Sequence, residues 1–136
     1  MSTNKTFSIA ELNATTVADI PRDLPLINKA TGEEIGITLK VVSEESAIFK
    51  AFQRKALNTE RMKLALQSKT GKTEVETWEE TEQKYDRAVA ARIVGWEGIT
   101  EEYSPALALQ LVSNNASIAE QVLKCSSEPV DFTANK

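Results

Sequence analysis

The amino-acid sequence predicts a mostly α-helical α+β fold, in which an N-terminal β-hairpin precedes a charged helical hairpin and two short C-terminal helices. Apolar and polar residues alternate from Ile35 to Val41, and this period of two is typical of a strand. The chain that follows has helical periodicity and sorted charges. Residues 46–73 carry seven Lys/Arg against one acid, and residues 74–102 carry nine acids against three bases. Two adjacent helices with balances of +6 and −6 can attract each other along their length.

A chain of 136 residues predicts a single domain, 1–136, with the modest core that an apolar fraction of 41% allows. Only eight residues are aromatic, so we expect a core made mostly of Leu, Ile, Val and Ala. Residues 1–23 have a weak pattern, and Pro21 and Pro25 interrupt any long element there. We therefore expect a weakly ordered N-terminal segment.

The β-hairpin is predicted at residues 24–42. Leu24 and Leu26 begin the first apolar segment, and the turn after it ends at Gly32, which can take a positive φ. An isolated hairpin is only marginally stable. This hairpin must therefore pack on the helices or pair with another chain.

The helical hairpin is predicted at residues 44–95. Ser43 is a suitable N-cap for its first helix, which extends to about residue 68. Leu57 and Leu64 form a second, minor apolar stripe beside the basic side of this helix. A helix with two apolar stripes contacts either a partner or two parts of its own fold. The main apolar face is predicted to consist of Ile48, Phe52, Ala56, Met62 and Leu66.

The second, acidic helix is predicted from about residue 73 to residue 95, where Gly95 ends it as a C-terminal glycine. Trp96 then lies between two glycines. It either wedges two helical units together or serves as an exposed aromatic anchor for a partner. The apolar stripe of this helix is predicted to be Trp78, Tyr85, Val89 and Ile93.

A C-terminal helical unit is predicted at residues 96–132. Ser104 and Pro105 form a helix start, an N-cap followed by proline at the first helical position. Asn115 ends that helix and can cap the next one. The buried side of the last helix is predicted to contain Ile118, Val122 and Cys125.

The sequence offers no constellation for catalysis, for a metal or for a cofactor. It contains no histidine, the commonest general base and metal ligand. The single cysteine, Cys125, cannot form an intrachain disulfide or a multi-thiolate zinc site, and it suits a reducing cytoplasm. Gly71-Lys72-Thr73 lacks the upstream glycine and the strand of a phosphate-binding loop, so we interpret it as a turn. We expect a binding or assembly module, not an enzyme.

Charge and hydropathy also bear on the class of partner. The net charge of −4 and the adjacent acidic helix disfavour nucleic acid as the partner of the basic helix. No apolar run approaches the ~20 residues that span a bilayer, and the polar N-terminus does not match a secretory signal. We therefore expect no membrane association.

The order of these features resembles the tail assembly chaperones of long-tailed bacteriophages. The resemblance covers residues 24–132. It begins at the hairpin sequence Ala-Thr-Gly-Glu-Glu-Ile-Gly-Ile, 30–37, and continues with the serines that open the charged helix. It then includes Gly-Trp-Glu-Gly-Ile at 95–99 and Tyr-Ser-Pro-Ala-Leu at 103–107. It closes with a short final segment that contains Ile118, Val122 and Phe132.

This resemblance implies a small protein that is made in the cytoplasm of the infected bacterial host and is absent from the mature virion. Such a protein binds the long helical tape-measure protein, keeps it soluble and recruits tail-tube subunits around it. Some members are also made as a longer form by programmed frameshifting. The resemblance implies no catalytic residue and no cofactor.

Two other functions stay open. The chain could be a structural tail completion or connector subunit of a phage particle, or a small helical regulatory protein that associates with nucleic acid. A homo-oligomer is compatible with each, through the hairpin edge or the apolar helix faces. The candidate partner-binding residues are Leu57, Leu64, Trp96 and Tyr103.

Overall fold

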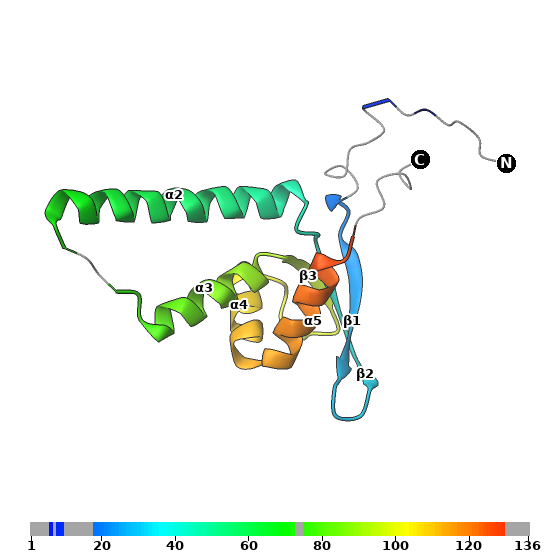
Figure 1. Ribbon diagram of the computed structural model, residues 1–136. Helices are drawn as coiled ribbons and strands as arrows, with labels where there is room; N and C mark the ends of the chain where they lie inside the picture. The colour runs from blue at the N-terminus through cyan, green and yellow to red at the C-terminus, as the bar shows by residue number, and fades with distance from the viewer. Residues whose placement is uncertain (1–5, 7, 10–17, 73–74, 130–136) are drawn as a thin grey trace.

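A computed structural model describes residues 6, 8–9, 18–72 and 75–129. Figure 1 shows a small body, in which helices pack on a sheet, and one long helix that leaves it. The predicted α+β, mostly helical fold class is confirmed. In chain order the elements are β1 (Arg22–Asn28), β2 (Glu33–Val41), α2 (Ala47–Thr70), α3 (Trp78–Ala90), β3 (Ile93–Glu97), α4 (Pro105–Asn114) and α5 (Ala116–Ser127).

The sheet is antiparallel, with strand order β1-β2-β3. The predicted hairpin is confirmed as β1 and β2, with Leu24 opposite Leu39. Gly32 has a φ of 74°, so the hairpin turn uses the conformational freedom of glycine. The exposed strand edge of β1 is partly covered by α5, because the Gln121 side chain accepts from the Ile27 N–H and donates to the Ile27 carbonyl, both at 3.0 Å.

The third strand corrects the sequence prediction. A helix running to Gly95 is wrong, since α3 ends at Ala90 and β3 begins at Ile93. The β-branched residues Ile93 and Val94 favour an extended chain, and pairing with β2 places Trp96 opposite Leu39. Gly95 therefore lies inside a strand and does not end a helix.

The hydrophobic core lies between the sheet, α4, α5 and the C-terminal end of α3. Ser104 and Pro105 start α4 as predicted, and the Ser104 hydroxyl accepts from the Leu107 N–H at 3.1 Å. Residues 130–132 of the predicted C-terminal unit lie outside the described part of the chain, as do most of residues 1–17 of the predicted N-terminal segment. The main buried members of the core are Leu26, Leu39, Val41, Val89, Ile93, Ala108, Val112, Ala119, Val122 and Cys125.

The helical hairpin differs from its prediction. Helix α2 is 24 residues long and, of its described residues, only Phe49 is buried. The predicted buried face is wrong over most of its length, because Ile48, Met62 and Leu66 are 49%, 74% and 62% exposed. Helices α2 and α3 do not pack against each other along their length. We call α2, α3 and their connection the arm.

Candidate functional site

The root of α2 is fixed by a serine cap. The Ser46 hydroxyl accepts from the Phe49 N–H at 3.1 Å, and both residues are buried. The predicted N-cap, Ser43, is therefore wrong by three residues, and its hydroxyl accepts from the Glu45 N–H at 3.2 Å instead. These contacts involve only the first turn of α2, so they orient the helix but do not bury the rest of it.

Arg92 joins this root to the body. Its guanidinium lies 4.1 Å from the centre of the Phe49 ring, and its Nη2 lies 3.2 Å from Glu44 Oε1. Its Nε donates to Ser126 Oγ at 3.1 Å, and its Nη1 donates to the Ala88 carbonyl at 2.6 Å. Burial lowers the pKa of Arg92, and the Glu44 carboxylate opposes that shift. Each nitrogen of the charged guanidinium therefore donates one hydrogen bond, and Arg92 ties α2, α3 and α5 together.

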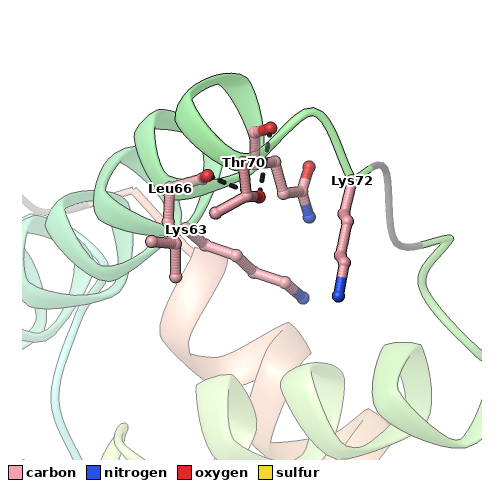
Figure 2. Close-up of a pocket in the computed structure, with 5 residues that line it drawn as sticks. Lys63, Leu66, Thr70 and Lys72 are labelled. Atoms are coloured by element: carbon pink, nitrogen blue, oxygen red, sulfur yellow. Dashed lines mark hydrogen bonds between the residues drawn. The ribbon is translucent and has the colours of Figure 1, made fainter.

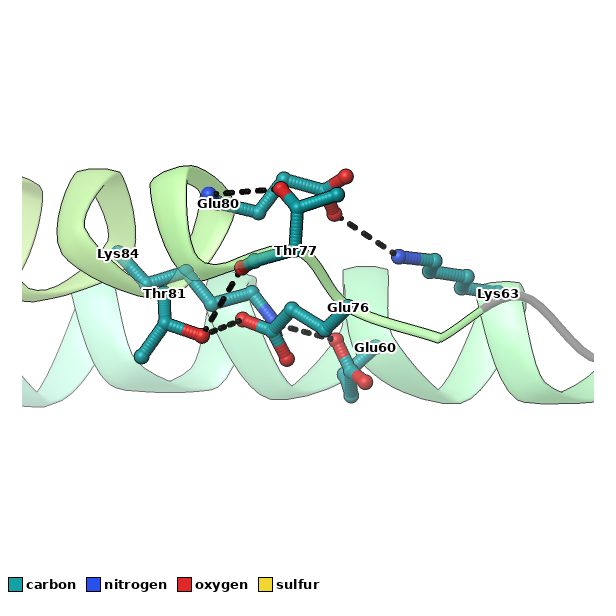
Figure 3. A network of polar contacts seen from close by, with 7 residues as sticks. All are labelled: Glu60, Lys63, Glu76, Thr77, Glu80, Thr81 and Lys84. Atoms are coloured by element: carbon teal, nitrogen blue, oxygen red, sulfur yellow. Dashed lines mark hydrogen bonds and ion pairs between the residues drawn. The ribbon is translucent and has the colours of Figure 1, made fainter.

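The far part of the arm is held by ion pairs between α2 and the start of α3, which Figure 3 shows. Lys84 Nζ lies 3.3 Å from Glu60 and 3.0 Å from Glu76, and Lys63 Nζ lies 3.8 Å from Glu80. The hydrogen bond with Lys84 lowers the pKa of Glu76, and the same bond raises the pKa of Lys84. These groups are largely solvated, so they set the spacing of the helices and stabilise the fold only slightly.

The basic side of α2 is not neutralised by α3. Within the described part of the chain, five of its cations form no ion pair or side-chain hydrogen bond. The predicted attraction along the two helices is thus limited to the Lys63 and Lys84 contacts. The unpaired cations are Lys50, Arg54, Lys55, Arg61 and Lys69.

The predicted candidates Leu57 and Leu64 lie next to these cations. They are 63% and 56% exposed, and they share one side of α2 because they are seven residues apart. Arg54 and Arg61, also seven residues apart, lie about 60° further around the helix from the two leucines. We call these four residues the leucine side of α2.

Helix α3 carries an exposed aromatic stripe whose residues are not among the predicted partner-binding residues. Trp78 is 77% exposed and Tyr85 is 47% exposed. The sequence placed both on the apolar stripe of the acidic helix, but only its last member in α3, Val89, is buried. Trp78 is the first residue of the helix, which Thr77 caps by accepting from the Glu80 N–H at 3.1 Å, and no local pattern indicates that this end of the stripe is exposed.

Trp96 and Tyr103, the other two candidates, lie in the body and contact each other. The centroids of their rings are 5.2 Å apart, in an edge-to-face arrangement. The Trp96 indole donates to the Glu101 carbonyl at 2.9 Å, and the Tyr103 hydroxyl donates to the Ile93 carbonyl at 2.7 Å. This half-buried pair closes the β3–α4 connection, so the wedge explanation for Trp96 matches its geometry.

A small open pocket of about 210 Å³ lies at the end of α2 (Figure 2). Gly71 has a φ of 69° and ends the helix, which agrees with the predicted turn. The Thr70 hydroxyl donates to the Leu66 carbonyl at 2.9 Å, as in an ordinary helix end. The lining residues are Lys63, Leu66, Gln67, Thr70 and Lys72.

Among the residues that the structure describes, no cluster of three or more His, Cys, Asp or Glu could hold a metal ion. No described helix is both long enough and apolar enough to cross a bilayer. Comparisons with protein families, with curated proteins and with solved structures found no match for this chain.

Proposed function

We propose that this protein is a tail assembly chaperone of a long-tailed bacteriophage. It binds the tape-measure protein, keeps it soluble and recruits tail-tube subunits around it during tail morphogenesis. It acts by reversible binding in the cytoplasm of the infected host, without catalysis or a cofactor, and it is absent from the mature virion.

The observation that carries this proposal is the apolar surface of the arm. Large exposed apolar side chains grouped in one part of a fold mark an interaction site, and in the arm they include Leu57 and Leu64 on α2 and Trp78 on α3. A tape-measure protein is long and helical and exposes apolar stripes before the tube covers it. Such a stripe fits the helix-on-helix mode of recognition, in which apolar anchors are spaced by one or two turns.

The modest size of this surface suits a chaperone that must later leave. Each arm offers only a few anchors, so a single contact is weak. Many copies along one long client gain strength from multivalency, and tail-tube subunits can still displace them one at a time. A connector subunit, by contrast, needs a permanent interface, which is larger and better covered.

The test is co-expression with the tape-measure protein encoded by the same genome. We expect this chain to keep the client in the soluble fraction and to co-purify with it. Leu57→Gln together with Leu64→Gln should abolish both effects and leave the helical circular dichroism unchanged, because these side chains are exposed and glutamine is a good helix former. The matched control is Met62→Gln with Leu66→Gln, on the other side of α2.

Mass spectrometry of purified phage particles separates the chaperone from the structural alternative. Absence of the chain from particles supports the chaperone function. Its presence at a fixed number of copies per particle contradicts that function and identifies a tail completion or connector subunit.

A further inference from the structure

The arm contains two surfaces that complement each other but do not meet within one chain. The first is the leucine side of α2, where Leu57 and Leu64 lie beside unpaired Arg54 and Arg61. The second is on α3 and is acidic where the first is basic.

On α3, Trp78 and Tyr85 form the exposed stripe. Glu82 lies about 40° around the helix from Trp78, and Glu79 lies about 100° from Trp78 in the same direction. Both acids are exposed, and neither forms an ion pair within the described residues. We call these four residues the tryptophan side of α3. It is an amphipathic helical surface with aromatic anchors and a negative rim.

The ion pairs of Figure 3 keep these two surfaces apart within one chain. Helix α3 turns Glu80 and Lys84 toward α2, and these residues lie more than about 90° around the helix from Trp78 and Tyr85. The aromatic stripe therefore points away from its own α2. The exposure of Leu57, at 63%, also shows that its own α3 does not cover it.

The spacing of the anchors matches as well. Leu57 and Leu64 are seven residues apart, as are Trp78 and Tyr85, so each pair spans about 10 Å of helix. Two helices whose anchors repeat at the same interval can pack with their side chains interdigitated.

We propose that the tryptophan side of α3 in one copy of this protein binds the leucine side of α2 in a second copy. Each copy offers one surface of each kind, so a two-fold dimer makes the contact twice. Burial of a tryptophan on leucines supplies most of the affinity, and the arginine–glutamate rim fixes the register. The contact requires no client, so its test is independent of the tail assembly proposal.

The experiment is sedimentation velocity of the purified full chain at low salt, with two charge-reversed variants. One carries Arg54→Glu and Arg61→Glu, and the other carries Glu79→Lys and Glu82→Lys. The unmodified chain should self-associate, and each variant alone should associate about tenfold or more weakly, because like charges then face each other. An equimolar mixture of the two variants should recover the association, since every reversed rim again meets an opposite charge.

Controls with the same change of net charge lie elsewhere on the molecule. Lys55→Glu with Lys69→Glu alters the other side of α2, and Glu101→Lys with Glu102→Lys alters the loop before α4. Both should associate like the unmodified chain. An equal loss in these controls, or a mixture that stays monomeric while both variants keep their helical circular dichroism, overturns the proposal.

Trp78→Ala provides a second test that leaves all charges in place. Its side chain is 77% exposed, so the fold should survive while self-association is lost. If the unmodified chain is monomeric at about 100 µM, the proposal is contradicted. Association that disappears after nuclease treatment contradicts it as well, and would assign the basic side of α2 to nucleic acid. Client binding by the α3 variants is then measured separately, because the leucine side is unchanged in them.

Discussion

At the scale of single residues, Gly98 is the most constrained position of the body. Its φ is 87°, and a Cβ at this position would lie far closer to the Gly36 carbonyl oxygen than van der Waals contact allows. The obstacle is backbone, so it cannot rotate away. Gly36 itself has a φ of 86°, but no atom lies within 4 Å of its own Cβ position. Substitution of Gly36 therefore tests the backbone conformation alone, whereas substitution of Gly98 adds a steric clash with the backbone.

We predict that Gly98→Ala lowers the free energy of unfolding by at least about 2 kcal/mol, because strained backbone and a backbone clash combine. Gly36→Ala should cost only about 1 kcal/mol, the price of a left-handed conformation alone. Urea unfolding followed by circular dichroism measures both. Equal losses in the two variants would show that Gly98 does not approach the hairpin so closely.

At the scale of elements, α2 is anchored at one end and solvated along the rest. Phe49 and the Arg92 contacts hold its first turn, and a few solvated ion pairs connect its second half to α3. The sequence-based expectation that the basic and acidic helices attract each other along their length is wrong for Lys50, Arg54 and Arg61. None of these three forms an ion pair with a described acid, so their reversal should not weaken the monomer.

We therefore predict different effects from reversing the two kinds of cation. In the Trp78→Ala background, Arg54→Glu with Arg61→Glu should leave the melting temperature unchanged at low salt. Lys84→Glu should destabilise the arm slightly, and added salt should reduce this loss, because exposed ion pairs are weak and screened. Amide hydrogen exchange in α3 checks the result, and identical protection in both variants would contradict the observed pairing.

At the scale of the whole molecule, stability resides in the body and binding resides in the arm. The core contains residues from every element except α2, and of the arm only the C-terminal end of α3 contributes to it. One buried and one half-buried titratable group in the body couple its stability to pH. Burial raises the pKa of the Cys125 thiol and of the Tyr103 hydroxyl.

The direction of this coupling follows from the raised pKa values. As pH rises above about 8.5, the unfolded chain ionises Cys125 before the folded chain does, so the unfolded state gains stability. We predict that the free energy of unfolding decreases from about pH 8 to about pH 10 and that Cys125→Ala reduces the decrease. Urea unfolding at several pH values measures it. The same slope in both proteins would show that the thiol does not contribute.

Part of the arm was accessible to sequence reasoning. The sorted charges separated α2 from α3, and the spacing of Leu57 and Leu64 placed both on one exposed side. The exposure of Trp78 was not accessible, because an apolar stripe has the same pattern whether a neighbour covers it or not. Only the position of α3 relative to the body decides that the stripe is buried at Val89 and exposed at Trp78.

By itself, the sequence determined the local structures: the alternating strand that ends at Val41, the turn at Gly32 and the start of α4 at Ser104. Each depends on residues near in the chain, so its pattern is sufficient. The tertiary structure alone decided that residues 93–97 form a strand and that α2 stands away from the core. These outcomes depend on contacts between distant segments, such as Leu39 with Trp96, whose energy no local pattern encodes.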